Sequence, residues 1–163
     1  MNGARTLAAA VLLSIAATAA GYAQSDGVLS TRGVGVRAGF GLDPDQGIIG
    51  VQAVMGHATR YAAFAPSVDL GFGSDVTTVM LNADIFLPLF APAGASAGVY
   101  LAVGPSVAIW NPSEGDGDTE IGLTIAPGLR LPLGSRHVFN LETRFGIGDI
   151  PEFRLLLGIL LAM

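Results

Sequence analysis

The feature that most constrains this chain is a two-residue alternation of apolar side chains that recurs from residue 34 to residue 161. Such a period is the signal of a β-strand with two different faces. One alternate phase holds no charged residue, and Thr143 is its only side chain with a polar group. The alternation predicts eight strands, within residues 34–42, 49–55, 64–72, 79–87, 99–109, 121–131, 139–147 and 153–161.

The opposite phase consists of small, polar and a few charged residues, such as Gly35, Arg37 and Ser67. Charged residues make up 13% of the chain, about half the share of roughly 25% in soluble domains, and hydrophobic residues make up 51%. A polar phase facing water would be expected to carry more Lys and Glu. The narrow interior of an eight-stranded barrel, by contrast, is filled by side chains of this kind.

A sheet that contacts hydrocarbon on one face must close on itself, because every backbone N–H and C=O needs an internal partner there. Segments of about ten residues with alternating hydrophobicity are typical of outer-membrane barrels. The sequence therefore predicts an all-β fold, a closed antiparallel up-and-down transmembrane β-barrel of about eight strands.

The first 23 residues have the pattern of a cleaved signal peptide. Arg5 supplies a positive charge, residues 7–20 are apolar, and Gly21-Tyr22-Ala23 places small residues three positions and one position before the expected cut. We expect residues 1–23 to be removed and residues 24–163 to form the barrel domain. The alternative is an uncleaved membrane anchor, although the apolar run is shorter than about 20 residues.

The charges of the connections between strands separate into two groups. If the first strand runs outward, the odd connections face the cell exterior, and with the adjoining strand ends they hold nine of the 13 acidic residues. The even connections hold His57, Arg60, Arg136 and His137 and no acid. Strands that run alternately up and down would produce this separation. Pro66, Pro105 and Pro127 oppose the strand assignment, unless bulges or strand ends accommodate them.

Seven charged residues lie on the polar phase and are expected in the bore. Since an unpaired buried charge is costly, they should form ion pairs. The simpler interpretation is a structural network that fills the bore, and the alternative is a gated ion path. These residues are Arg37, Asp69, Asp84, Arg130, Glu142, Arg144 and Arg154.

The sequence offers little support for other chemistry. Ser135 and His137 could face one side of a strand, but no third residue completes a catalytic triad. The acidic residues Asp43, Asp45, Glu114, Asp116 and Asp118 fit solvated turns better than a calcium loop. We therefore predict no enzyme activity, cofactor or metal site.

The chain has no Cys and a net charge of −5, which argues against a disulfide framework and against binding of nucleic acid. Trp110, Phe40, Phe72 and Phe153 lie near the ends of predicted strands and are candidates for an interfacial aromatic girdle.

The whole pattern resembles the small eight-stranded outer-membrane barrels, the group of the OmpA transmembrane domain and OmpX. The likeness rests on the leader, the eight segments and an apolar last strand, residues 152–163, which ends in Met163 where the family usually has Phe or Trp. It implies a location in the outer membrane, contact with outer-membrane lipid and recognition by the assembly machinery. Members of the group are structural, adhesive or protective. A small gated channel and a soluble, lipocalin-like periplasmic barrel with the apolar phase inward are the alternatives.

Overall fold

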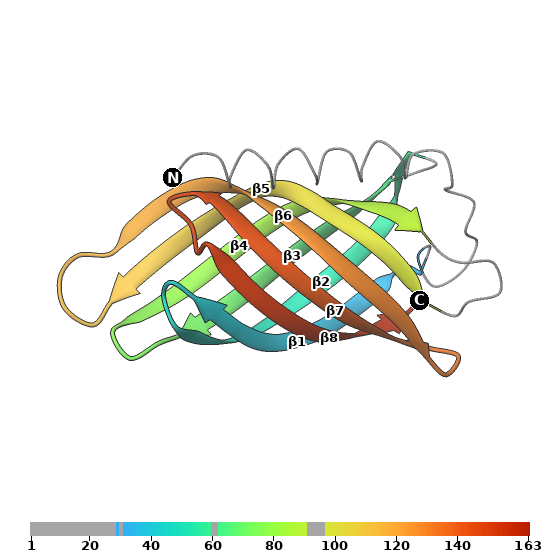
Figure 1. The fold of residues 1–163 in the computed structure, drawn as a ribbon, viewed down its shortest axis with the longest axis horizontal. Coiled ribbons are helices and arrows are strands. Elements are labelled where there is room, and N and C mark those ends of the chain that lie inside the picture. The colour runs from blue at the N-terminus through green and yellow to red at the C-terminus, as the bar shows by residue number, and fades with distance from the viewer. Residues whose placement is uncertain (1–28, 30, 60–61, 91–96) are drawn as a thin grey trace, which may run out of the picture.

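The computed structural model describes residues 29, 31–59, 62–90 and 97–163 of the chain. Eight tilted antiparallel strands form a closed barrel, in which each strand pairs with its neighbours in the sequence (Figure 1). The strands are β1 (Gly33–Leu42), β2 (Gln46–Thr59), β3 (Ala62–Phe72), β4 (Val76–Phe90), β5 (Gly98–Pro112), β6 (Asp118–Leu133), β7 (His137–Gly148) and β8 (Phe153–Ala162). The predicted fold class is confirmed, and the strands extend beyond most of the predicted segments.

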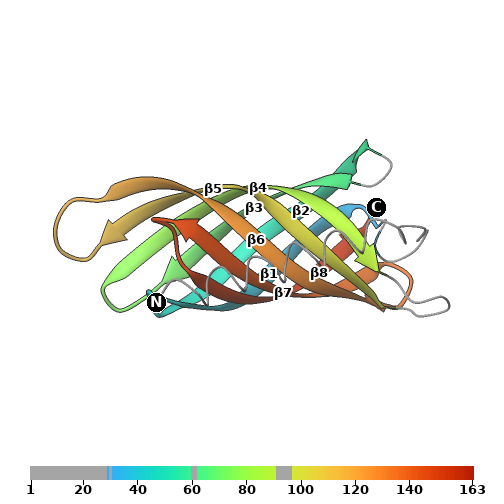
Figure 2. The same ribbon diagram turned by 45° about the horizontal axis from the view of Figure 1, so that its top comes forward.

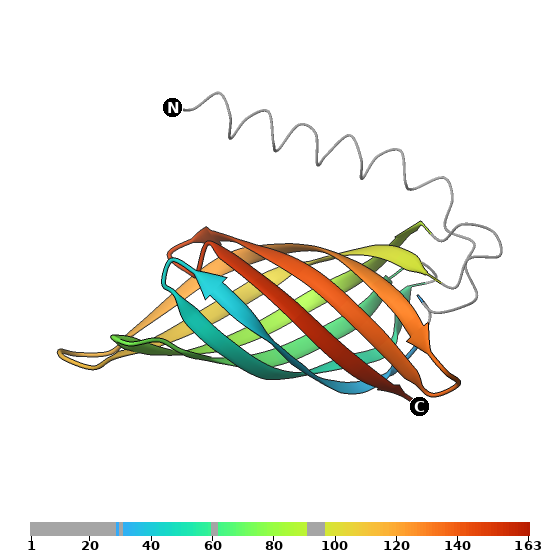
Figure 3. The same ribbon diagram turned by 60° about the horizontal axis from the view of Figure 1, so that its bottom comes forward.

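Strands β1 and β8 close the barrel along a continuous seam. Their register runs without a break from the pair Gly33–Ala162 to the pair Leu42–Phe153. We call the end of the barrel where β1 begins and β8 ends the proximal end, and the opposite end the distal end. The β5–β6 connection extends farthest at the distal end in all three views (Figures 1, 2 and 3).

The alternation seen in the sequence separates the outside of the barrel from its bore. Val36 is 63% exposed, whereas its neighbour Arg37 is 5% exposed. The exposed large apolar side chains of every strand belong to the predicted apolar phase, apart from strand-end residues such as Phe90. The lipocalin-like alternative, in which this phase faces inward, is therefore wrong.

Glycines on β1 allow the close approach of β1 and β8. A Cβ atom added to Gly33, Gly35 or Gly39 would collide with the backbone of β8, at Leu161, Ile159 and Leu155 respectively. Gly47 on β2 is different, because the nearest atom to its Cβ would be the Phe72 carbonyl oxygen at 4.0 Å. The glycines of β1 are thus required by contact across the seam.

Pro66, Pro105 and Pro127, which opposed the strand assignment, lie inside strands and interrupt pairing on one side only. The register of β5 with β6 is continuous through Pro105 and Pro127. The register of β4 with β5 skips Ala83 and Asp84 opposite Pro105, and that of β6 with β7 skips the residues opposite Pro127. Pro66 likewise pairs regularly with β4 but faces a gap on β2. Each missing N–H therefore interrupts one ladder. Of the two expected accommodations, bulges or strand ends, the strand ends do not occur, because all three prolines lie within strands.

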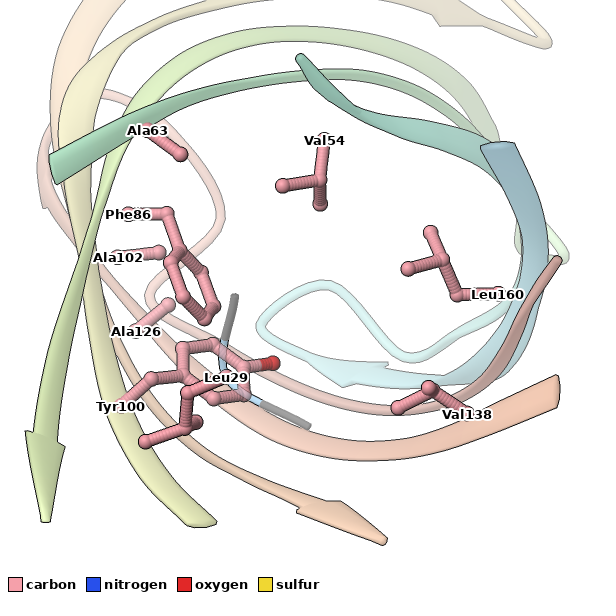
Figure 4. Close-up of a cluster of buried hydrophobic side chains, with 9 residues drawn as sticks. All are labelled: Leu29, Val54, Ala63, Phe86, Tyr100, Ala102, Ala126, Val138 and Leu160. Carbon is pink, nitrogen blue, oxygen red and sulfur yellow. The ribbon is translucent and has the colours of Figure 1, made fainter. Parts of the chain in front are cut away.

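Two apolar clusters fill the ends of the bore. The proximal cluster consists of Leu29, Val54, Ala63, Phe86, Tyr100, Ala102, Ala126, Val138 and Leu160. Figure 4 shows these side chains pointing into the bore from opposite walls, with Leu29 beside Tyr100. The distal cluster consists of Met80, Ala108 and Ile150, with Trp110 packed against it. The expectation that Trp110 belongs to an outer aromatic girdle is therefore wrong.

The predicted signal peptide, residues 1–23, lies outside the described residues, and so does the start of the predicted barrel domain at residue 24. In the part of the chain that the structure describes, no helix is long and apolar enough to cross a membrane.

The contacts across the seam predict that Gly39→Ala destabilises the barrel. The added methyl group collides with the Leu155 carbonyl, and overpacking of this kind costs about 1–3 kcal/mol. Unfolding in guanidinium chloride, followed by gel mobility of the barrel in phospholipid vesicles, measures the change. Gly47→Ala is the matched control and should unfold within about 0.5 kcal/mol of the wild type. Equal effects of the two substitutions would contradict the account of the seam.

Candidate functional site

The structure places all seven predicted charged residues in the bore, and all are buried. They come from six strands: Arg37 from β1, Asp69 from β3, Asp84 from β4, Arg130 from β6, Glu142 and Arg144 from β7, and Arg154 from β8. All seven residues belong to the inward phase of the alternation. Because residues two apart on a strand share a face, this phase of every strand faces the bore.

Arg37 and Asp69 form a two-pronged ion pair. The Nε of Arg37 donates to Oδ1 of Asp69 at 2.6 Å, and Nη2 donates to Oδ2 at 2.6 Å. The same Nη2 also donates to the hydroxyl of Ser67 at 2.6 Å. Parallel hydrogen bonds between a guanidinium and a carboxylate combine strength with a fixed geometry, so this pair fixes β1 relative to β3 across the bore.

Glu142 connects that pair to a second one. Its Oε1 accepts from Nη1 of Arg144 at 2.8 Å and from Nη1 of Arg37 at 3.3 Å. Its Oε2 accepts from the hydroxyl of Tyr100 at 2.8 Å. The Nη2 of Arg144 donates to Oδ2 of Asp84 at 2.7 Å. The result is one chain of alternating charge, Asp69–Arg37–Glu142–Arg144–Asp84, which crosses the bore.

The other two arginines have weaker ionic contacts. Nη1 of Arg154 lies 3.4 Å from Oδ2 of Asp69. The guanidinium of Arg130 lies 4.0 Å from the centre of the Phe86 ring and 5.3 Å from that of Tyr100, a geometry that stabilises a cation. Its Nη1 donates to the Thr31 carbonyl at 3.4 Å. None of the carboxylates that the structure describes forms an ion pair with Arg130.

Uncharged polar residues complete the network, and the sequence reading did not assign them to it. Asn82 donates to Ser67 and to Asp69, and accepts from the hydroxyl of Ser106. The hydroxyl groups of Ser106 and Thr124 are 2.7 Å apart. All of these residues lie on the inward phase, which was the available signal. Their partners could not be read from the sequence, because they depend on how far the strands are offset around the barrel.

The apolar clusters shield this network at both ends of the bore. The proximal cluster packs Phe86 against Tyr100, with ring centres 4.5 Å apart. At the distal end Ile150, in the β7–β8 connection, is 3% exposed. The cavity beside Arg37, Glu142 and Arg144 has a volume of about 10 Å³, which is close to the space that one water molecule needs. The described side chains therefore leave no wide aqueous passage at this level of the bore.

The residues considered for catalysis or metal binding lie outside the network. Ser135 and His137 are exposed, at the turn between β6 and β7, and the side chain of His57 lies outside the described set. Asp43, Asp45, Glu114, Asp116 and Asp118 are exposed at the distal end. Among the described residues, no group of three or more His, Asp or Glu side chains could hold a metal ion.

Several solved structures share this fold, although the sequence matches no protein-family model and no curated protein. The N-terminal β-barrel domain of OprF from Pseudomonas aeruginosa superposes with a TM-score of 0.63 at 13% identity, over 82% of this chain and 100% of that one. Neisserial surface protein A superposes with a TM-score of 0.62 at 12% identity, over 81% of this chain and 96% of that one. The outer-membrane protein Ail of Yersinia pestis superposes with a TM-score of 0.53 at 10% identity, over 82% of this chain and 100% of that one.

These likenesses define the class: the chain has the fold of the small eight-stranded outer-membrane β-barrels, as the resemblance in sequence predicted. At identities of 10–13% they show the fold alone.

The network predicts a large loss of stability for Arg144→Met. The substitution leaves the Asp84 carboxylate buried without its cation, and breaking a buried pair in this way costs about 3–5 kcal/mol. Guanidinium unfolding in phospholipid vesicles measures the free energy. Asp84→Asn in the same chain should restore part of the loss, because it removes the stranded charge.

Arg136→Met is the control for that experiment, because Arg136 is exposed in the β6–β7 turn. Its unfolding free energy should change by less than about 0.5 kcal/mol. A loss for Arg144→Met no larger than that of Arg136→Met would show that the buried pairs do not hold the barrel together.

Proposed function

We propose that this protein is a structural or surface-interaction barrel of the outer membrane, with a bore closed to ions by the network of arginines and carboxylates. The observation that carries the proposal is the chain of ion pairs from Asp69 to Asp84, buried between two apolar clusters. A path for ions would require these pairs to separate in a bore of low dielectric, where separation is costly.

The outer surface supports a position across a membrane. Apolar side chains on all eight strands are exposed, among them Val51, Leu81, Leu123 and Leu157. An apolar surface that surrounds a closed barrel is far larger than the patches found on soluble monomers, and it suits contact with lipid acyl chains. Outer-membrane lipid is therefore the first partner that we propose. The second is the assembly machinery, which would recognise β8.

The distal end supports contact with other surfaces. Its connections carry exposed acids, which include Asp45, Asp75, Glu114 and Asp149, whereas the β6–β7 turn at the proximal end carries Arg136. We propose that the distal end faces the cell exterior and favours cationic partners. One Ail structure contains sucrose octasulfate, a heparin analogue. The acidic distal end of this chain favours the opposite charge.

Conductance in a planar lipid bilayer tests the closed bore. We expect no steady single-channel openings from the purified barrel at any applied voltage at which the bilayer is stable. A folded gel band that shifts on boiling, taken from the same preparation, shows that the inserted protein is a closed barrel. Steady openings in the wild type that Arg144→Ala abolishes would contradict the proposal and establish a small gated channel.

A variant without the proximal cluster tests in the same assay how much that cluster contributes to closing the bore. Phe86→Ala with Tyr100→Ala removes the two largest side chains of that cluster and one hydrogen bond to Glu142. Brief openings should become more frequent in this variant than in the wild type. If neither protein shows openings while the folded gel band is present, the ionic network alone closes the bore.

A further inference from the structure

We propose that the outer wall of the barrel carries a binding site for one glycerophospholipid, with an acyl chain in a groove over β1 and β2 and the phosphate beside Arg136 and His137. The inference rests on the proposed function and deepens it, because it names one specific lipid site on a wall that contacts lipid throughout. The site lies outside the barrel, away from the ion pairs of the bore.

Two apolar grooves adjoin each other on the outer face of β1, β2, β3 and β8. Figure 3 shows β8, β1 and β2 side by side on the face toward the viewer. The grooves have volumes of about 660 and 890 Å³, within the range of about 300–1,000 Å³ that is typical of small-molecule sites. They form one continuous surface, because both are lined by four exposed side chains from adjacent strands, Val36, Val51, Val68 and Ile159.

The larger groove is deepest over β1 and β2, because the outward side chains there are short. It is lined on these strands by Val34, Val36 and Ala53, among others. The β8 partners of Val34 and Val36 are the longer Leu161 and Ile159. Outward side chains on one strand are two residues apart, or about 6.6–6.8 Å. A chain of methylene groups fits between two such rows.

The larger groove runs from the proximal edge toward the middle of the barrel. It is lined at one end by His137, the first residue of β7, and at the other by Leu81, well inside β4. His137 pairs with Leu161 on β8, and Leu161 pairs with Val34 on β1. Val34 pairs in turn with Ala53 on β2. A lipid of one leaflet has its phosphate at the edge of the apolar layer and its chain ends at the middle, which is the course of this groove.

The proximal end of the groove carries a positive charge. Arg136 directly precedes His137 and is exposed, and its carbonyl accepts from the N–H of Ala162 at 2.8 Å. None of the described carboxylates forms an ion pair with Arg136. A guanidinium suits phosphate, because it offers parallel hydrogen bonds. The distal end is unsuited to phosphate, because exposed acids such as Asp45 and Asp149 would repel it.

Native mass spectrometry of the intact barrel measures the retained lipid. The purified barrel takes up phosphatidylglycerol in detergent micelles, and detergent washing then removes the excess. We expect one phosphatidylglycerol molecule to remain on most wild-type barrels. A wild type that retains none, or that retains several in a random distribution, would overturn the proposal.

Val36→Phe tests the groove, because Val36 lines both parts of it. The larger ring fills the space of the acyl chain, and the retained fraction should fall roughly fivefold or more as several CH₂ groups lose their contact. Val103→Phe makes the same change on the outward phase of β5, which lines neither groove, and should retain lipid like the wild type. A gel band that shifts on boiling shows that both variants are folded. Equal retention by the two variants would contradict the groove as the binding site.

Arg136→Gln combined with His137→Gln tests the phosphate contact. The barrel is offered equal amounts of phosphatidylglycerol and of diacylglycerol with the same acyl chains. The wild type should favour phosphatidylglycerol by about threefold, as is typical of exposed ion pairs, and the double variant should show no preference. Ser135→Ala, in the same turn, is the control and should keep the preference. A double variant that also keeps it would show that the phosphate binds elsewhere.

Flotation of the barrel with phospholipid vesicles distinguishes this proposal from the one on which it rests. A barrel that does not float with the vesicles would contradict the position in a membrane, and the lipid site with it. A barrel that floats but retains no phosphatidylglycerol in detergent would contradict the lipid site alone.

Discussion

The ion pairs in the bore are the interaction on which the rest of the structure depends. Arg37, Glu142 and Arg144 join β1, β3, β4 and β7 through hydrogen bonds of 2.6–3.3 Å. Burying such charges is favourable only when each is paired and water is excluded. The apolar clusters at the two ends exclude water, and the closed ring of strands satisfies the backbone. Neither the apolar clusters nor the closed ring of strands is sufficient alone. An open end would hydrate the charges, and an unclosed sheet would expose its edges to lipid.

Residues without side chains are as important to this arrangement as the charged ones. The β1 glycines let β8 approach closely enough to close the seam. Gly128 leaves room for the ring of Tyr100, whose hydroxyl donates to Glu142. The prolines have a related effect. Pro105 faces a gap in the pairing of β4 with β5 at Ala83 and Asp84, and Pro127 faces a gap in the pairing of β6 with β7 at Arg144. Two members of the ion-pair chain, Asp84 and Arg144, therefore lie where the ladders are locally incomplete.

Much of the fold could be predicted from the sequence, because a period of two residues determines which face of a strand each side chain occupies. Val36 and Arg37 could therefore be assigned to opposite sides of the barrel wall from the sequence alone. The ion pair between Arg144 and Asp84 could not be predicted in this way, because it depends on the register of the four strands from β4 to β7. Trp110 was misassigned because its place near a strand end suggested an interface, although its position in the alternation directs it inward. The cover formed by Leu29 precedes the first strand, where no periodicity operates.

The central claim is that the charge-free face of the alternation contacts lipid while the ionic face is enclosed. The chain has no Cys, so single cysteines introduced at Leu81 and Leu157 can carry a spin label without further changes, and Glu114 in the distal connection provides the reference. Electron paramagnetic resonance of the labelled barrel in phospholipid vesicles measures collisions with oxygen, which dissolves in lipid, and with a water-soluble nickel chelate. The account predicts that labels at positions 81 and 157 collide mainly with oxygen and the label at 114 mainly with nickel. Nickel collisions at positions 81 and 157 as frequent as those at 114 would contradict it.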